Sequence, residues 1–441
     1  MIDTFLIEPT RVQQVLSQHM LVDGFDITLD LQNSQGVYLY DSKRQRRLLD
    51  FFTFIASNPI GFNHPKMHTE SFVKKIGEIA LIKPSLSDVY PEEFAEFVET
   101  FFSIAVPDYF KYVFFIEGGT LAVENALKAA FDWKVQKNFK KGYREEKGNK
   151  IIHFREAFHG RSGYALSMTN TDINKIKFFP KFNWPRILNP KITFPLNEEN
   201  LQKVIESEKI AIEQIKQAII ENKDDIAGLI IEPIQGEGGD NHFRKEFFVQ
   251  LRELCDENEM LFIMDEVQTG VGMTGKWWAH QHFVQPDIIA FGKKTQVCGI
   301  LSTSRIDEVE SNVFHTPTRI NSTWGGNLVD MVRFQRILEI IDEDNLVENA
   351  RVMGDYLLQQ ITEIADKYSH LISNPRGRGL FAAFDVATPE LRKKILNDAL
   401  ENNLMILGCG EKSIRFRPNL AIKREEIDEG FEILNKVLIN L

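Results

Sequence analysis

An acid and a lysine follow two apolar runs in the middle of the chain, and together they suggest one chemistry. Asp265 ends the run LFIMD, and Lys293 comes two residues after the run DIIAF. Such continuous apolar runs are typical of parallel strands covered on both faces, whose ligands lie beyond their carboxyl ends. Both side chains can therefore point at one place. Pyridoxal phosphate (PLP) requires this pair, because its ring nitrogen needs an acid and its aldehyde needs a lysine.

A glycine turn further upstream is a candidate for binding the phosphate. The apolar run 111–116 leads into Gly118, Gly119 and Thr120, and a helix is predicted from 121 to 133. Free N–H groups and the helix dipole attract anions at such a turn, although many turns of this kind contain glycine for steric reasons alone. The fingerprints of dinucleotide sites and P-loops are absent, which favours a phosphate monoester and argues against a nicotinamide-dependent dehydrogenase.

Two polar or aromatic side chains follow the strand predicted at 150–154 and could contact a ligand. Phe158 could stack on a planar ring, and Arg161 could bind a carboxylate in a bidentate fork. Taken alone, a phenylalanine is more often part of a core and an arginine more often a surface residue. Only their position next to the other strand ends favours a role in a site.

Two glutamates lie in the glycine-rich turn EPIQGEGG that follows the strand predicted at 226–231. Glu232 and Glu237 are candidate site residues because this turn also comes after the carboxyl end of a strand. Alternatively, one or both cap the next helix, predicted at 244–257.

The elements that position these residues recur as strand, turn and helix from residue 111 to 304, which is typical of a doubly wound α/β domain. From about residue 325 long amphipathic helices and short strands indicate a smaller α+β lobe, completed by amino-terminal strands with a turn at 33–36. The lobe is predicted to contain helices at 328–345, 347–368, 389–402 and 424–438 and strands at 404–407 and 413–416. The expected division is an amino-terminal segment at 1–50 that joins the small domain, a large domain with a mostly parallel sheet at 51–322 and a small domain at 323–441.

The composition restricts the possible partners. A net charge of −11 argues against nucleic acid, and the basic residues at 137–150 are interspersed with glutamate, as in a solvated loop. Three widely spaced cysteines indicate neither a disulfide framework nor a zinc site. No apolar run reaches the 18 or more residues of a membrane span, and the first residues do not resemble a secretion signal. A cytoplasmic protein without a metal is expected.

Several segments resemble the class III (ω-amino acid) aminotransferases of fold type I, and most closely the lysine ε-aminotransferases among them. The resemblance covers nearly the whole chain. It rests on FIEGGTLAVENALKAAFDWK, AFHGRSGY, EPIQGEGGDNHFR, DEVQTGVG, AFGKKTQVCG and NSTWGGN. Two departures from the wider class, GGTLA in the phosphate turn and KTQ after the reactive lysine, are shared with the lysine ε-aminotransferases and sharpen the assignment.

The resemblance implies a role for each cofactor-binding residue. Lys293 would bind PLP covalently and then move a proton between the substrate carbon and the cofactor, and Asp265 would keep the ring nitrogen protonated. The other expected cofactor contacts are Gly119 and Thr120 at the phosphate, Phe158 and Val267 on the two ring faces, His159, Gln268 at the 3′ oxygen, and Thr323 at the phosphate of the neighbouring subunit. The last contact implies a homodimer with shared sites.

The resemblance also implies how one site would accept both L-lysine and 2-oxoglutarate. Arg161 would bind the distal carboxylate of either substrate, and Arg415 only the proximal carboxylate of 2-oxoglutarate. Glu237 would neutralise Arg415 in the lysine half-reaction and then move aside. Glu232 would shape the site near the ring, and Asn321 is a further expected substrate contact.

Other activities remain possible from the sequence. The products expected with lysine are L-2-aminoadipate 6-semialdehyde and L-glutamate. Ornithine or 4-aminobutyrate are alternative amino donors, and an aminomutase or decarboxylase on the same fold is a more distant alternative. A catalytically silent relative with a regulatory role should have lost Lys293 or Asp265, and both are present.

Overall fold

The computed structural model describes residues 7–441, and its centre is a sheet of seven strands. Only β10 runs against the direction of the other six strands, so the prediction of a mostly parallel sheet is confirmed. In spatial order the strands are β4 (Phe110–Ile116), β10 (Cys298–Thr303), β9 (Ile288–Phe291), β8 (Leu261–Asp265), β7 (Ile226–Ile231), β5 (Lys150–Phe154) and β6 (Arg186–Ile187).

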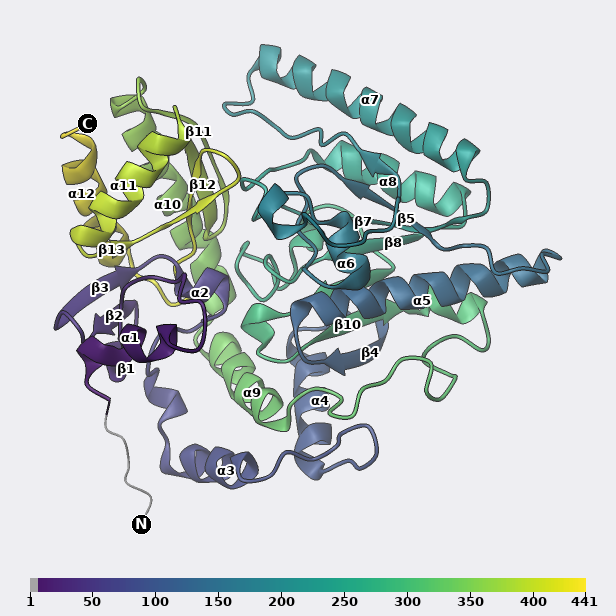
Figure 1. Cartoon of the computed structure of the whole chain (residues 1–441), viewed down its shortest axis with the longest axis horizontal. Helices are drawn as coiled ribbons and strands as arrows, with labels where there is room; N and C mark the ends of the chain where they lie inside the picture. The colour runs from purple at the N-terminus through teal and green to yellow at the C-terminus, as the bar shows by residue number, and fades with distance from the viewer. Residues whose placement is uncertain (1–6) are drawn as a thin grey trace.

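Both faces of this sheet are buried, which explains why its strands are continuously apolar. Alternate side chains enter different clusters: Ile263 of β8 packs on the side of α5 (Gly119–Lys140), whereas Phe262 and Met264 pack on the opposite side. That opposite side is covered by α4 (Glu92–Ile104), α8 (Lys245–Glu257) and α9 (Leu328–Glu343), while α7 (Glu198–Glu221) lies at the outer edge (Figure 1).

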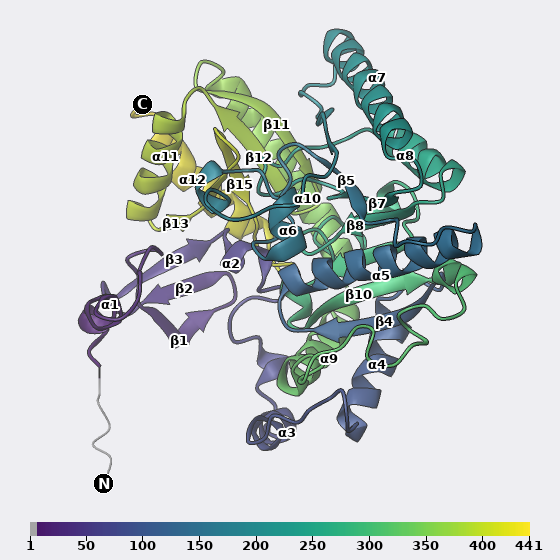
Figure 2. The same cartoon turned by 45° about the vertical axis from the view of Figure 1, so that its right-hand side comes forward.

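A second group of elements lies beside the large sheet and contains two smaller sheets (Figure 2). One is antiparallel, in the order β11 (Ile372–Arg378), β12 (Phe381–Val386), β15 (Ser413–Phe416) and β14 (Leu407–Cys409). The other contains β1 (Leu29–Gln35), β2 (Tyr38–Asp41), β3 (Arg46–Asp50) and β13 (Leu404–Met405). The helices α10 (Leu346–Lys367), α11 (Pro389–Glu401) and α12 (Arg424–Leu438) complete this lobe.

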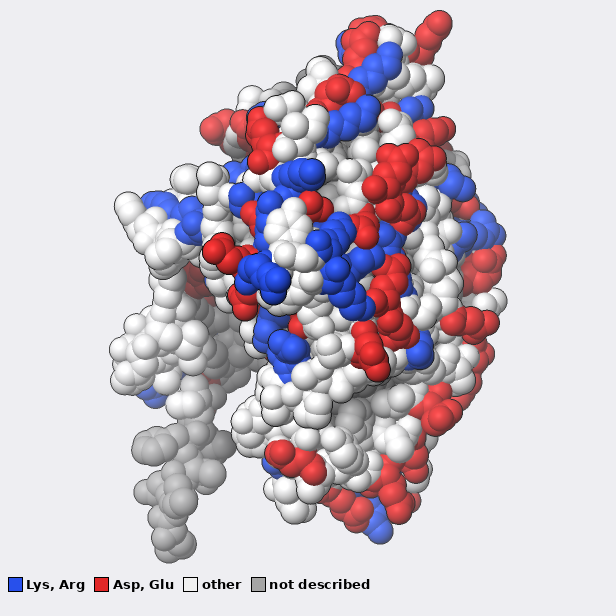
Figure 3. All heavy atoms as spheres, turned by 90° about the vertical axis from the view of Figure 1, so that its right-hand side faces the viewer, with Lys and Arg blue, Asp and Glu red and all other residues white. Residues whose placement is uncertain are grey.

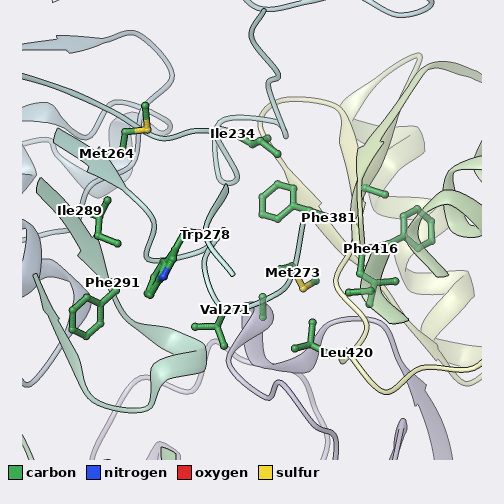
Figure 4. Packing of buried hydrophobic residues seen from close by; sticks show 14 of the residues in the cluster. Ile234, Met264, Val271, Met273, Trp278, Ile289, Phe291, Phe381, Phe416 and Leu420 are labelled. Carbon is green, nitrogen blue, oxygen red and sulfur yellow. The ribbon is translucent and has the colours of Figure 1, made fainter. Parts of the chain in front are cut away.

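One hydrophobic cluster connects the large sheet with the lobe. Figure 4 shows it extending from Met264 and Phe291 past Trp278 to Phe381 and Phe416. The amino-terminal strands are joined to the lobe because β3 pairs in parallel with β13. The domain boundaries at residues 50 and 322 stay a prediction, and residues 1–6 lie outside the described part of the chain. The remaining helices are α1 (Val12–Ser17), α2 (Thr53–Ala56), α3 (Glu70–Ala80) and α6 (Gly163–Met168).

Two of the local predictions were wrong at the surface of the molecule, in the first hairpin and at the end of α5. The first hairpin turns at Gly36 and Val37, and residues 33–35 belong to β1. Helix α5 continues to Lys140, so the basic segment 137–150 begins as helix and not as a loop. Some of its basic side chains are nevertheless paired with acids, as Lys137 is with Glu308 at 2.6 Å, and Figure 3 shows basic side chains gathered in the middle of this face with acidic side chains beside them.

Within residues 7–441 no helix is long and apolar enough to cross a membrane.

Candidate active site

The sheet brings the predicted residues together because five of its strands end at the same edge. β4, β5, β7, β8 and β9 all run in one direction, since β10 is antiparallel to both of its neighbours. Their carboxyl ends therefore supply the glycine turn, the segment with Phe158, the turn with both glutamates, Asp265 and Lys293. Ligands of α/β sheets bind at this edge.

Lys293 and Lys294 are adjacent in sequence but differ in their surroundings. Lys293 has a left-handed backbone (φ 56°) and is half-buried on the wall of a cavity of about 550 Å³. Its side chain has no hydrogen-bond partner among the described residues. Burial, and then the charge of Arg415, lower the pKa of Lys293 to about 8. A larger fraction of this amine is therefore unprotonated near neutral pH, as a nucleophilic lysine requires.

Lys294 is instead a structural residue. Its side chain is buried, and Nζ donates hydrogen bonds to the carbonyl oxygens of Gln268 at 2.7 Å and of Ala56 at 3.3 Å. Burial, followed by the neighbouring charges of Lys293 and Arg417, lowers its pKa well below the usual value. The structure thus places Lys293, and not Lys294, on the wall of a cavity.

Asp265 ends β8 in a buried position and contacts His159. The Nδ1 atom of His159 lies 2.8 Å from Oδ2 of Asp265, and the backbone N–H of Val267 donates to Oδ1 at 3.1 Å. A carboxylate only accepts hydrogen bonds, so the imidazole carries its proton on Nδ1 in this contact. His159 therefore fixes the orientation of the Asp265 carboxylate.

The glycine turn at the start of α5 presents unpaired donors. The N–H groups of Gly119, Thr120 and Leu121 have no acceptor among residues 7–441, and no side chain caps this end of the helix. A side chain at position 119 would collide with Val267, because its Cβ would lie 2.9 Å from Cγ1. The glycine turn therefore packs closely against Val267 and against Gly292, the residue before Lys293. The amino terminus of the helix remains free to bind an anion.

Gln268 is held by Arg417, a residue that sequence reasoning did not identify. The Nε and Nη2 atoms of Arg417 donate to Oε1 of Gln268 at 3.3 and 3.2 Å. Oε1 is therefore occupied, and the amide NH₂ of Gln268 is the group left to donate to a ligand. Arg417 is held in turn by Asp240, whose Oδ2 lies 2.8 Å from Nη1. Arg417 lies in the segment 415–418 (RFRP), and its partners Gln268 and Asp240 are too distant in sequence to infer.

Glu232 supports the loop that carries Phe158. Its two oxygens accept hydrogen bonds from the backbone N–H groups of Phe158 at 2.9 Å and Gly236 at 3.2 Å. Burial, together with the nearby charge of Asp265, raises the pKa of Glu232 to about 7, although His159 acts in the opposite direction. The alternative that Glu232 caps the helix α8 is wrong, because its oxygens are bound at the other end of the turn.

Glu237 lies between two cations. Its Oε2 accepts a hydrogen bond from Nη2 of Arg415 at 3.0 Å, and its Oε1 accepts one from Nζ of Lys175 at 2.6 Å. Burial alone would raise the pKa of Glu237, but the charges of Arg415 and Lys175 outweigh it and lower the pKa. Arg415 is only 2% exposed, and its Nε and Nη1 atoms have no partner in the described part of the chain. Lys175 lies outside every motif of the sequence.

Three predicted residues are exposed in the single chain. Arg161 is exposed, with its backbone N–H bound to Oγ1 of Thr120 at 3.1 Å. Asn321 and Thr323 are also exposed, and the carbonyl oxygen of Thr323 accepts a hydrogen bond from Ser85 at 2.6 Å. No hydrogen bond links Asn321 or Thr323 to Lys293 within the described chain. Their predicted contacts with substrate and with the phosphate of the neighbouring subunit therefore stay predictions.

The residues that are present fit PLP. A helix amino terminus with three unpaired N–H groups suits its phosphate, and a buried carboxylate at Asp265 suits its ring nitrogen. Lys293 has a lowered pKa and reaches a cavity, which suits a bond to its aldehyde. The amide of Gln268 retains a free donor for an oxygen substituent of the ring.

Comparison with known proteins agrees with this geometry. The L-lysine-epsilon aminotransferase of Mycobacterium tuberculosis is 48% identical over 432 residues, which are 98% of this chain and 96% of that protein. The enzyme of the same name from Streptomyces clavuligerus is 45% identical, over 96% of this chain and 93% of its own. Human mitochondrial 4-aminobutyrate aminotransferase is 31% identical, over 97% and 89% of the two chains.

Solved structures agree as well. The lysine aminotransferase from M. tuberculosis in the internal aldimine form superposes with a TM-score of 0.96 at 47% identity, covering 98% of this chain and all of that one. A transaminase from Virgibacillus, at 20% identity and a TM-score of 0.82, shares the fold. Residues 22–438 match the family model of class III aminotransferases. The chain belongs to the class III aminotransferases and is a PLP-dependent enzyme of fold type I.

Proposed function

We propose that this aminotransferase transfers the ε-amino group of L-lysine to 2-oxoglutarate, giving L-2-aminoadipate 6-semialdehyde and L-glutamate. The observation that carries this proposal is the buried Arg415 paired with Glu237. Such a pair suits an enzyme whose two substrates differ by one carboxylate beside the reacting carbon. The relatives named lysine aminotransferases support lysine as the amino donor.

The chemical step divides between cofactor and protein. PLP supplies an aldehyde that binds the amine and a ring that withdraws electrons from the reacting carbon. Asp265, oriented by His159, would hold a proton on the ring nitrogen through a charge-assisted hydrogen bond. Lys293 Nζ would take the proton from the ε-carbon of lysine and deliver it to the cofactor, because its lowered pKa allows it to act as a base near neutral pH.

The two arginines would allow both substrates to bind in the same site. Arg161, which is exposed and bound through its backbone N–H to Thr120 of the glycine turn, would bind the carboxylate far from the reacting carbon in either substrate. Arg415 would bind the carboxylate next to the keto group of 2-oxoglutarate in place of Glu237, which occupies its Nη2 in the structure. In the lysine half-reaction Arg415 would have no substrate partner, and Glu237 would neutralise it.

We also propose a homodimer in which Thr323 and Asn321 complete the partner's site. Both residues are exposed in one chain, and no hydrogen bond joins them to Lys293 or Asp265 in the described part of it. Trp324 is exposed next to Thr323, and Leu81, Ile82 and Tyr90 are exposed in the segment whose Ser85 contacts Thr323. These exposed apolar side chains support an interface there.

The second candidate function is transfer from 4-aminobutyrate, which the 31% identical relative favours. Ornithine is a further alternative with the same mechanism. Adding L-lysine without a keto acid to the yellow holoenzyme should abolish its visible absorbance band. A response to 4-aminobutyrate or ornithine but not to lysine would overturn the substrate and leave the mechanism in place.

Glu237→Ala tests whether Glu237 neutralises Arg415 during the lysine half-reaction. In single-turnover measurements it should slow the lysine half-reaction by about 10- to 100-fold, because a buried arginine then lacks a counter-ion, and it should affect the 2-oxoglutarate half-reaction less. Equal losses in both half-reactions would contradict the proposed alternation of partners.

A further inference from the structure

Lys175 contacts the site although no motif and no assigned role includes it. It ends a short 3₁₀ turn, Ile173–Lys175, in the segment that follows the Phe158 loop. Its side chain is only 15% exposed, which is unusual for a lysine outside a functional or structural pairing. Nζ lies 2.6 Å from Oε1 of Glu237, 3.4 Å from Oγ1 of Thr171 and 5.2 Å from the centre of the Phe158 ring.

The two oxygens of Glu237 are divided between two cations of different kinds. Arg415 is fixed, since it lies in β15 and is 2% exposed. Lys175 binds the other oxygen of the carboxylate and lies on a segment outside the large sheet. A carboxylate that leaves Arg415 therefore remains next to a positive charge and does not become an unpaired buried ion.

We propose that Lys175 is a positioning residue that retains the Glu237 carboxylate while Arg415 binds the carboxylate of an incoming keto acid. This inference rests on the proposed function only in assuming that the site accepts a dicarboxylate. In this proposal, the position of the Glu237 carboxylate between Lys175 and Arg415 determines which substrate the site binds more readily.

The direction of the effect follows from the charges. In the absence of Lys175, Glu237 has Arg415 as its only cationic partner in the described site, so an incoming carboxylate must displace it from its last counter-ion. Binding of a dicarboxylate should therefore weaken. The lysine half-reaction requires Glu237 on Arg415, and it should be spared. These effects are the reverse of those expected for Glu237→Ala.

The test uses glutarate, a dicarboxylate without a keto group, which binds without reacting. Its dissociation constant is measured by titration calorimetry on the PLP-loaded enzyme. Lys175→Met should weaken glutarate binding about tenfold, the equivalent of one partly buried charge-assisted hydrogen bond. Lys175→Arg should restore binding to within about threefold of the wild type, because it keeps the charge. A melting temperature equal to that of the wild type would show that the variants are folded.

Lys191→Met provides a matched control. Lys191 also donates to a glutamate at 2.6 Å, but that partner is Glu156, and the two side chains are 45% and 39% exposed. A surface pair of this kind contributes little, so its removal should change glutarate binding less than twofold. An equal effect of Lys191→Met and Lys175→Met would overturn the inference.

A double-mutant cycle distinguishes positioning from direct attraction. In the Glu237→Ala background Lys175→Met should change glutarate binding less than twofold, since there is no carboxylate left to hold. If Lys175→Met weakens binding about tenfold with or without Glu237, Lys175 attracts the ligand directly and the inference fails. It also fails if the wild type does not bind glutarate. If glutarate binding follows the expected pattern but lysine gives no spectral change, the inference holds and the proposed amino donor is wrong.

Discussion

Replacing Arg417 with methionine should destabilise the protein more than any surface ion-pair change. Arg417 is 1% exposed and donates to both oxygens of Asp240, which is itself fully buried. It also donates to the carbonyl oxygen of Phe416 at 2.8 Å, and its guanidinium lies 3.3 Å from the centre of the Phe381 ring. These contacts connect the lobe to the glycine-rich turn of the site.

The magnitude follows from the charge that would remain. Methionine fills a similar volume and keeps the apolar contact with Phe381, so most of the loss comes from the unpaired carboxylate of Asp240. Removing one member of a buried ion pair costs about 3–5 kcal/mol. Replacing Asp240 with asparagine in the same chain removes that charge. The double variant should therefore be more stable than Arg417→Met alone by about 2 kcal/mol, within the range of that penalty.

Urea unfolding at a fixed concentration of protein and PLP measures these differences, because bound cofactor and partner both contribute to apparent stability. Arg351→Met is the matched control: Arg351 pairs with Glu348 at 2.6 Å, but the side chains are 52% and 48% exposed, and the loss should stay below about 1 kcal/mol. A loss below about 1 kcal/mol for Arg417→Met, or a double variant no more stable than the single one, would refute the reasoning.

Three further predictions concern the site. In the PLP-free protein, acetylation of Lys293 by acetic anhydride should follow a pKa of about 8. Lys294 should stay unlabelled because its Nζ is buried and hydrogen-bonded, and equal labelling in mass spectra would contradict their different surroundings. The pKa of Glu232 is raised to about 7, so its contribution to stability is complete below pH 4.5 and is lost as the pH rises through 7. Glu232→Gln should reduce the change of the melting temperature with pH between pH 5 and 8. An unchanged pH dependence would show that Glu232 is not its cause. Thr323→Ala should weaken PLP binding about tenfold if it removes a bond to the phosphate in the partner's site. A hybrid dimer of one Thr323→Ala protomer and one Lys293→Ala protomer should regain one site of normal affinity, because that site combines an intact Lys293 with an intact Thr323. Protomers with independent sites could not recover in this way.

Much of the fold could be predicted from the sequence because the strands of a doubly covered sheet are uninterrupted apolar runs. The strands 150–154, 226–231 and 413–416 and the last helix, 424–438, were predicted with the bounds that the structure gives. The first hairpin turn was misplaced because Ser34 is polar yet buried within β1. Its hydroxyl donates to the carbonyl of Asp30 and accepts from the N–H of Tyr40, and such pairing depends on a neighbouring strand.

The short strands of the lobe show a similar limit. Residues 404–407 were expected to form one strand, but β13 ends at Met405 and β14 begins at Leu407, and the two belong to different sheets. An apolar run of four residues does not indicate which partner each residue pairs with. The change of sheet depends on contacts with strands far away in the sequence.

Site residues at strand ends were accessible to sequence reasoning because topology places them together. The sequence contained no comparable signal for Lys175, Arg417 or the fixed position of Lys294, because each acts through a partner distant in sequence. Spacing within a motif indicates which residues share an element, but it does not indicate which charges are paired across elements.

The pairing of β3 with β13 has a consequence for synthesis of the protein on the ribosome. Leu49 pairs with Leu404, so the outer edge of the first hairpin sheet has no partner until some 350 further residues have been made. At about 5–20 residues per second this interval is roughly 20–70 s. During that time an unpaired edge is open to association with other nascent chains. We therefore expect yield in cells to depend more on early chaperone binding to residues 29–50 than on the stability of the finished enzyme.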